Sequence, residues 1–101
     1  MQMVMMVFRR SLEHEVLPMI EQEQLPFTRL DNVQGKGATG HIPGSVMWDG
    51  SNTILLLAVP DERLASFQAQ VHRCHEEEAA ALQKGVGMPF HAFVLPCIQW
   101  F

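Results

Sequence analysis

One continuous apolar run, "ILLLAVP" at Ile54–Pro60, places the strongest constraint on how this 101-residue chain folds. A strand with one face in water alternates apolar and polar side chains, whereas this run presents apolar side chains to both faces. The run is far too short to cross a bilayer as a helix, which takes about 20 apolar residues. We therefore expect Asn52–Pro60 to form a central strand of a sheet that is covered on both faces.

Three further segments have the patterns of strands. Met3–Phe8 is a second continuous apolar run, Phe27–Gln34 alternates between apolar and polar residues, and Phe90–Leu95 stops at a proline. The last five residues, "CIQWF" at Cys97–Phe101, are too apolar to remain in water. We expect this tail to pack or pair.

Two segments have the spacing of amphipathic helices. The first starts at Leu12 and predicts a helix over Leu12–Gln24, with Ser11 as its N-cap and a kink at Pro18. The second follows Asp61, which suits its N-cap, and ends before the glycines of "GVG". The apolar stripe of this second helix comprises Leu64, Phe67, Val71, Cys74 and Leu82.

The order strand, helix, two strands, helix, strand predicts an α+β fold. It is the ferredoxin-like βαββαβ sandwich, an antiparallel sheet with helices on one face, and it occupies residues 1–101 as a single domain. Because the central strand is apolar on both faces, the face without helices needs a cover. Another copy of the chain is the simplest cover, so we expect a trimer-forming protein whose sheets face inward.

Composition excludes several classes of function. The net charge is −4 and the isoelectric point is about 5.6, with no basic patch, so we expect no nucleic-acid partner. The two cysteines, Cys74 and Cys97, lie in different predicted elements and are expected to be buried thiols of a reducing compartment. The opening residues lack the features of a signal peptide, which favours the cytoplasm.

A long glycine-rich segment separates two of the predicted strands. Two residues can turn a hairpin, yet Gly35–Asn52 uses eighteen. A long ordered insertion of this kind is usually functional. Its opening, "GKGATG", lets backbone N–H groups approach an anion, and Lys36 adds a positive charge. The spacing is not that of a Walker A motif, and no helix obviously follows, which argues against a dinucleotide-binding fold.

The chain resembles the PII-like signalling proteins along nearly its whole length. The matching segments are "MMVFRRSLEHEVLPMIEQ", "LDNVQGKGATG", "AVPDERLASFQAQV" and "FHAFVLP". The resemblance is closest to a branch with a short T-loop that is often associated with metal-efflux systems. It extends more faintly to the trimeric, ferredoxin-like CutA proteins.

The resemblance implies a regulatory protein and no enzyme. Family members are homotrimers that bind small molecules, typically adenine nucleotides, in the clefts between subunits. Gly35–Asn52 would be the T-loop, which responds to the ligand and docks a partner such as a membrane transporter or an enzyme. Independently of the resemblance, the sequence holds neither H-E-x-x-H nor a nucleophile elbow with a serine triad.

The resemblance also assigns ligand-binding residues. Gly35 and Gly37 match the G-x-G at the start of the T-loop, and Gly85 and Gly87 fall at the phosphate-binding B-loop. His91 stands where the family has a lysine, and Ala38-Thr39 replaces the usual Arg-Gln. The expected ligand-binding residues are Gly35, Lys36, Gly37, Thr39, Gly40, Gly85, Gly87 and His91.

Two further hypotheses concern a partner and a metal. Met47 and Trp48 are candidates for contacts with a partner protein, although Trp48 could equally fold the loop back onto the body. The alternative to nucleotide sensing is a metal-responsive trimer linked to metal efflux or tolerance, binding a divalent or soft transition metal. Its candidate ligands are His41, His91, His72 and His75, of which the last two share a helix face.

Overall fold

The computed structural model describes residues 1–35, 52–81 and 89–101. The elements of these residues are β1 (Gln2–Arg9), the 3-10 helix η1 (Arg10–Leu12), α1 (Glu13–Gln22), β2 (Thr28–Val33), β3 (Asn52–Val59), α2 (Asp61–Ala81) and β4 (Phe90–Pro96). Every expected strand and helix is therefore present in the described part of the chain.

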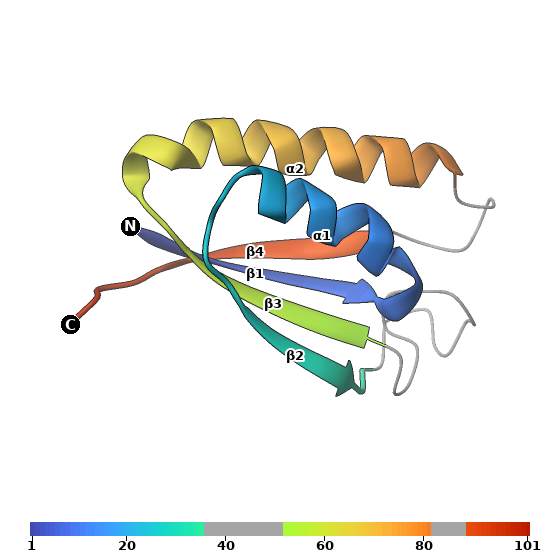
Figure 1. The fold of residues 1–101 in the computed structure, drawn as a ribbon, viewed down its shortest axis with the longest axis horizontal. Coiled ribbons are helices and arrows are strands. Elements are labelled where there is room, and N and C mark those ends of the chain that lie inside the picture. Colours follow the sequence, from blue (N-terminus) through green and yellow to red (C-terminus); the bar gives the residue numbers. More distant parts are fainter. Residues whose placement is uncertain (36–51, 82–88) are drawn as a thin grey trace.

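The strands of the described residues form one antiparallel sheet in the order β2-β3-β1-β4. Helices α1 and α2 pack on the same face of this sheet (Figure 1). The ferredoxin-like α+β fold is confirmed, and β3 is a central strand as its composition predicts.

The core lies between the helices and the sheet. Along β1 and β3 the side chains that point toward the helices alternate with those that point away, and the first set is almost entirely buried. Helix α1 adds the apolar face of its four-residue repeat, and α2 adds an aromatic ring. The central core residues are Val4, Met6, Phe8, Val16, Ile20, Leu55, Leu57, Val59 and Phe67.

The opposite face of the sheet, which we call the open face, is also apolar. Met5 pairs with Leu56 in the centre of this face. Toward the edges, Leu30 of β2 and Phe93 of β4 are each 46% exposed. No described element covers these side chains. The composition of the strands predicts that both faces of the sheet are covered, but in the single chain only the helix face is covered.

Two helix starts differ from the sequence-based expectation. The turn η1 precedes α1, so the N-cap of α1 is Leu12, without a side-chain hydrogen bond. Ser11 is not the N-cap, because it lies within η1; its hydroxyl accepts a hydrogen bond from Arg9 Nε at 2.9 Å. Asp61 is the first residue of α2, and its carboxylate accepts a hydrogen bond from the amino group of Met1 at 2.5 Å.

The end of the first helix also differs slightly. Helix α1 ends at Gln22, two residues earlier than predicted, and includes Pro18. Gln24 has a φ of 56°, the left-handed conformation that commonly ends a helix, just ahead of Leu25-Pro26.

The C-terminal tail does not pack within the chain, contrary to expectation. Ile98 is 87% exposed and Trp100 is 85% exposed, and Phe101 is fully exposed. Cys74 and Cys97 are both free thiols, but only Cys74 is buried, so the prediction of burial is wrong for Cys97. Among the described helices, none has the length and apolar character needed to cross a membrane.

Candidate functional site

One end of the sheet carries the roots of both long connections. Because neighbouring strands are antiparallel, the last residues of β1 and β2 meet the first residues of β3 and β4 at the same end. Helix α2 also finishes there (Figure 1). We call this the loop end, since Gly35, Asn52, Ala81 and Pro89 bound the two connections there.

Most of the expected ligand residues fall in those connections. Gly35 and His91 lie in the described part of the chain, as do His72 and His75. The remaining candidates lie outside the described residues: Lys36, Gly37, Thr39, Gly40, His41, Met47, Trp48, Gly85 and Gly87.

A row of side chains crosses the open face near the loop end. Leu30 of β2 pairs with Ile54 of β3, which pairs with Val7 of β1, which pairs with His91 of β4. Three strand spacings of about 4.8 Å make this row about 14 Å long. The row Leu30–Ile54–Val7 forms an apolar floor that ends at His91 on β4. At the opposite end of the row, Gly35 follows β2.

The length of this row limits what could contact both of its ends. Gly35 and His91 lie at opposite edges of the sheet, so a small anion cannot touch both within one chain. A ligand that spans the row needs a flat or apolar part to lie on the floor and a polar end to reach the histidine.

Two other side chains, Phe93 and Arg9, lie near the end of the row that holds His91. His91 stacks on Phe93, with ring centroids 6.1 Å apart and planes at 27°. Arg9 is the last residue of β1. By its register it shares the open face with Val7, and it lies two residues closer to the loop end. The sequence alone does not identify Arg9 or the floor residues as site residues, because their register depends on strands that are distant in sequence.

The histidines of α2 belong to the other side of the sheet. The His75 ring meets Phe90 edge-on, with centroids 4.9 Å apart and planes at 85°. His72, His75 and His91 border a cavity of about 260 Å³ between α2 and β4. Nevertheless, the described residues contain no group of three or more His, Cys, Asp or Glu side chains able to hold a metal ion.

The thiol of Cys74 on α2 is not in the deprotonated form that binds metals either. Burial raises the pKa of Cys74 to about 11, and the nearby carboxylates of Glu78 and Glu77 act in the same direction. Metal ligation and nucleophilic attack require the thiolate. At neutral pH Cys74 is therefore a protonated core residue.

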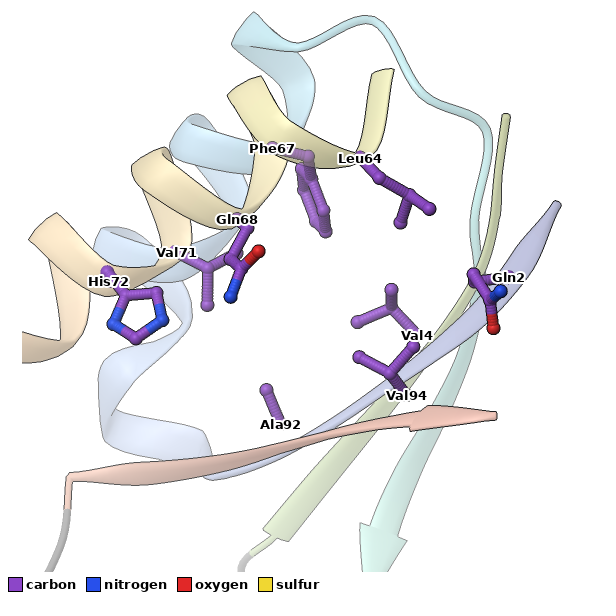
Figure 2. A pocket seen from close by; sticks show the side chains of 9 residues that line it. All are labelled: Gln2, Val4, Leu64, Phe67, Gln68, Val71, His72, Ala92 and Val94. Atoms are coloured by element: carbon purple, nitrogen blue, oxygen red, sulfur yellow. The ribbon is translucent and has the colours of Figure 1, made fainter. Parts of the chain in front are cut away.

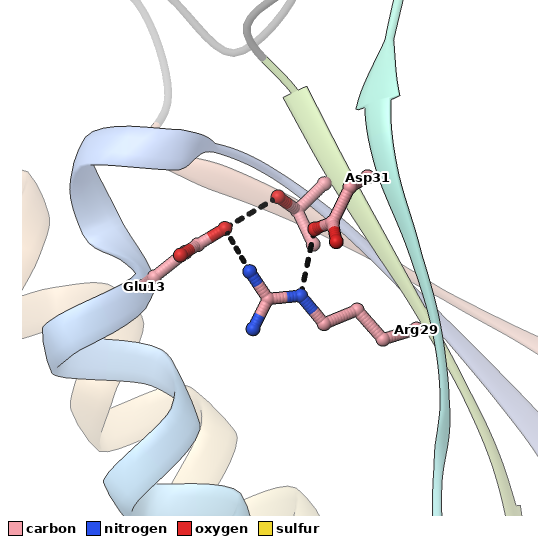
Figure 3. A network of polar contacts seen from close by, with 4 residues as sticks. Glu13, Arg29 and Asp31 are labelled. Carbon is pink, nitrogen blue, oxygen red and sulfur yellow. Dashed lines mark hydrogen bonds and ion pairs between the residues drawn. The ribbon is translucent and has the colours of Figure 1, made fainter.

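A polar network fixes the loop end beside α1 (Figure 3). Glu13 Oε1 accepts hydrogen bonds from Arg29 Nη2 at 2.6 Å and from Thr53 Oγ1 at 2.9 Å. Arg29 Nε also donates to Asp31 at 2.7 Å. This bond to Asp31, helped by the charge of Glu13 and opposed by desolvation, raises the pKa of Arg29. The network joins the start of α1 to β2 and β3, close to the roots of the long connection.

An apolar groove lies between α2 and β4 (Figure 2). We call this cavity of about 490 Å³ the α2–β4 groove. Its lining contains no Asp, Glu, Lys or Arg, so it is unsuited to a phosphate group. The lining residues are Gln2, Val4, Leu64, Phe67, Gln68, Val71, His72, Ala92 and Val94.

Comparison with known proteins identifies the fold. No protein-family model and no curated protein matches the sequence. The structure is similar to that of CPII, a nitrogen regulatory PII-like protein from Thiomonas intermedia K12, bound to ADP, AMP and bicarbonate. The TM-score is 0.64 at 16% identity, covering 92% of this chain and 81% of that one.

Two more solved structures agree. CPII from the same organism, bound to ADP and bicarbonate, has a TM-score of 0.65 at 17% identity and matches 92% of this chain and 81% of its own. A PII-like protein from Thermus thermophilus has a TM-score of 0.55 at 17% identity, with 92% and 82% covered. The chain therefore has the ferredoxin-like fold of the PII-like proteins.

Proposed function

We propose that this protein is a PII-like regulator that senses an adenine nucleotide at the loop end of its sheet. The observation that carries the proposal is the row Leu30–Ile54–Val7–His91, an apolar floor about 14 Å long with a histidine at one end. Similarly folded CPII binds ADP and AMP, and this supports the ligand class. Bicarbonate, also bound by CPII, is the smaller anion to be compared.

The floor belongs to an apolar face that needs a second copy. In the proposed homotrimer the sheets face inward, so a neighbouring subunit covers the open face and closes a cleft over the ligand. Leu30 and Phe93, both about half exposed in the single chain, lose water in this arrangement. The ligand then contacts two subunits.

Side-chain N–H donors at the loop end suit the phosphates. His91 and Arg9 approach from the described strands, and Lys36 belongs to the sequence that follows Gly35. The glycines Gly85 and Gly87 precede β4, where backbone N–H groups can bind phosphate oxygens.

We expect ligand binding to be signalled to a partner through the long connection Gly35–Asn52. In the proposal Gly35–Asn52 acts as a T-loop, and Met47 and Trp48 contact a partner such as a transporter or an enzyme. The protein itself regulates and does not catalyse. Its placement in the cytoplasm stays a prediction.

Calorimetric titration with ADP, AMP and bicarbonate tests the proposal. Loss of one charge-assisted hydrogen bond costs about 1.5–3 kcal/mol, so His91→Ala should weaken nucleotide binding by about 10- to 100-fold. The matched control is His14→Ala, an exposed histidine on α1 remote from the floor, which should bind like the wild type. Equal effects of both variants would contradict the assigned site.

A metal titration of the same samples separates the alternative function. Zinc binding that is lost in the His72→Ala/His75→Ala double variant, without any nucleotide binding, would support a metal-responsive protein instead. Binding of bicarbonate alone would show that the apolar floor does not hold a base.

A further inference from the structure

Two apolar features of this chain remain without partners in the described structure. The first is the tail Cys97–Phe101, whose large side chains are almost fully exposed. The second is the α2–β4 groove, which contains no charged residue. Each would bury apolar surface if it met the other.

An extended tail presents one apolar face that suits such a groove. Residues of β4 with even numbers, such as Phe90, pack on the helix side of the sheet, and Ala92 and Val94 line the groove. In an extended tail, Ile98 and Trp100 share one face because side chains alternate along a strand. This face is wholly apolar.

Strand β4 also offers a backbone for the tail to pair with. It is at the edge of the sheet in the described residues, so one side of its backbone has no neighbouring strand. Figure 2 shows the groove between α2 and the side chains of Ala92 and Val94 on β4. An extended segment that pairs with the free edge of β4 would border this groove and could direct alternate side chains into it. Edge pairing and groove filling are therefore achieved by the same segment.

The tail of the same chain is poorly placed to do this. To return along its own β4 it must turn at Cys97-Ile98, immediately after Pro96, and tight hairpin turns favour glycine or asparagine with positive φ. Isoleucine is β-branched and disfavours positive φ. Ile98 would then be part of the turn, and its side chain could not enter the groove beside Trp100. In the structure the tail instead runs away from α2 (Figure 1).

We propose that the tail of one copy pairs with the β4 edge of a second copy and fills its α2–β4 groove with Ile98 and Trp100. Ile98 and Trp100 together can bury about 350 Å², and the groove and edge lose a similar area. The sum, roughly 700 Å², adds to the area that the inward-facing sheets bury in the proposed trimer. A contact that joins different surfaces of the two copies forms a closed ring when the rotation that relates them closes, as it does in the proposed trimer.

Disulfide trapping tests this contact. The variant carries Gln68→Cys in the groove and Ile98→Cys in the tail, with Cys97→Ser to remove the neighbouring thiol. Oxidation of the purified protein should give covalent bands of two or more chains on a non-reducing gel. A disulfide within one chain, or no disulfide, would overturn the proposal.

A neighbouring position on α2 provides the matched control. Ala69 is exposed and does not line the groove, so Ala69→Cys with the same two tail substitutions should give little or no covalent dimer. Equal trapping at both positions would mean random collisions and would contradict a seated tail.

Removal of the tail tests its energetic role. A chain ending at Pro96 should keep its far-UV circular dichroism but dissociate at protein concentrations at least tenfold higher than the full chain, measured by analytical ultracentrifugation. An unchanged association constant would contradict the proposal. ADP titration of the full chain is a separate measurement, so the tail contact and the nucleotide site can fail independently.

Discussion

Substitution of Glu13 tests most directly whether its hydrogen bonds stabilise the loop end of the sheet. One of its oxygens accepts hydrogen bonds from Thr53 at 2.9 Å and from Arg29 at 2.6 Å. Thr53 is only 1% exposed, so water cannot easily replace the carboxylate when Glu13 is changed to alanine. The substitution Glu13→Ala therefore leaves a buried hydroxyl group without this acceptor.

The expected cost follows from these contacts. Losing a hydrogen bond to a charged group costs about 1.5–3 kcal/mol. Losing an acidic residue from the first turn of α1 adds about 0.3–1 kcal/mol. The ion pair with Arg29 is partly exposed to solvent and adds little. We expect the free energy of unfolding to fall by about 2–4 kcal/mol, which lowers the Tm of a chain of this size by roughly 10–20 °C.

Thermal unfolding followed by circular dichroism measures this change at one fixed protein concentration, because assembly makes Tm depend on concentration. Glu15→Ala is the matched control: Glu15 is in the same helical turn but is half exposed and pairs only with His14 at 3.3 Å among the described residues. Its substitution should cost less than about 1 kcal/mol. Glu13→Gln, which keeps an oxygen acceptor for Thr53, should lie between the two.

A double-mutant cycle with Thr53→Val isolates the hydrogen bond itself. If the contact is as important as its burial indicates, the effects of Glu13→Ala and Thr53→Val should be less than additive by at least about 1 kcal/mol. The reasoning is refuted if the two effects simply add, or if Glu13→Ala and Glu15→Ala lower Tm equally.

Further predictions concern the sheet faces and the thiols. Leu57→Ala, in the core, should lower the free energy of unfolding by about 2–5 kcal/mol in chemical denaturation. Leu56→Asp, on the open face, should instead shift the mass measured by light scattering toward the monomer; an unchanged mass would exclude this face as an interface. At pH 8 a thiol reagent should label Cys97 rapidly and Cys74 only after unfolding, because burial raises the pKa of Cys74 to about 11; two fast thiols would contradict this.

The fold could be predicted because its main signals are local. The apolar run at Ile54–Pro60 identifies a central strand, and the four-residue repeat from Leu12 identifies a helix. Cap residues were harder to predict, since they depend on competition between nearby groups. Ser11 illustrates this: it lies within a 3-10 turn that precedes the helix, and its hydroxyl accepts a hydrogen bond from Arg9.

The candidate site could be predicted only in part. His91 follows from the resemblance, but the floor beneath the proposed ligand combines Leu30, Ile54 and Val7 from three strands. A shift of one residue in any pairing would send these side chains to the other face, and periodicity alone does not fix that register. The tail was expected to pack or pair, but the sequence alone does not show that its proposed partner belongs to another copy.

The open face has two proposed occupants, and their arrangement determines how ligand binding and assembly are coupled. The nucleotide would cover the row that ends at His91, near the loop end, whereas the neighbouring sheet would cover the centre around Met5 and Leu56. These areas adjoin but do not coincide, so neither occupant has to displace the other. A ligand that touches both subunits binds the assembled form more tightly than the single chain, and by linkage it stabilises the assembly by the same free energy. The Glu13 network ties β2 and β3 to α1 on the helix side of the sheet, one residue along each strand from Leu30 and Ile54. We therefore expect a displacement of these strands at the cleft to reach the roots of Gly35–Asn52.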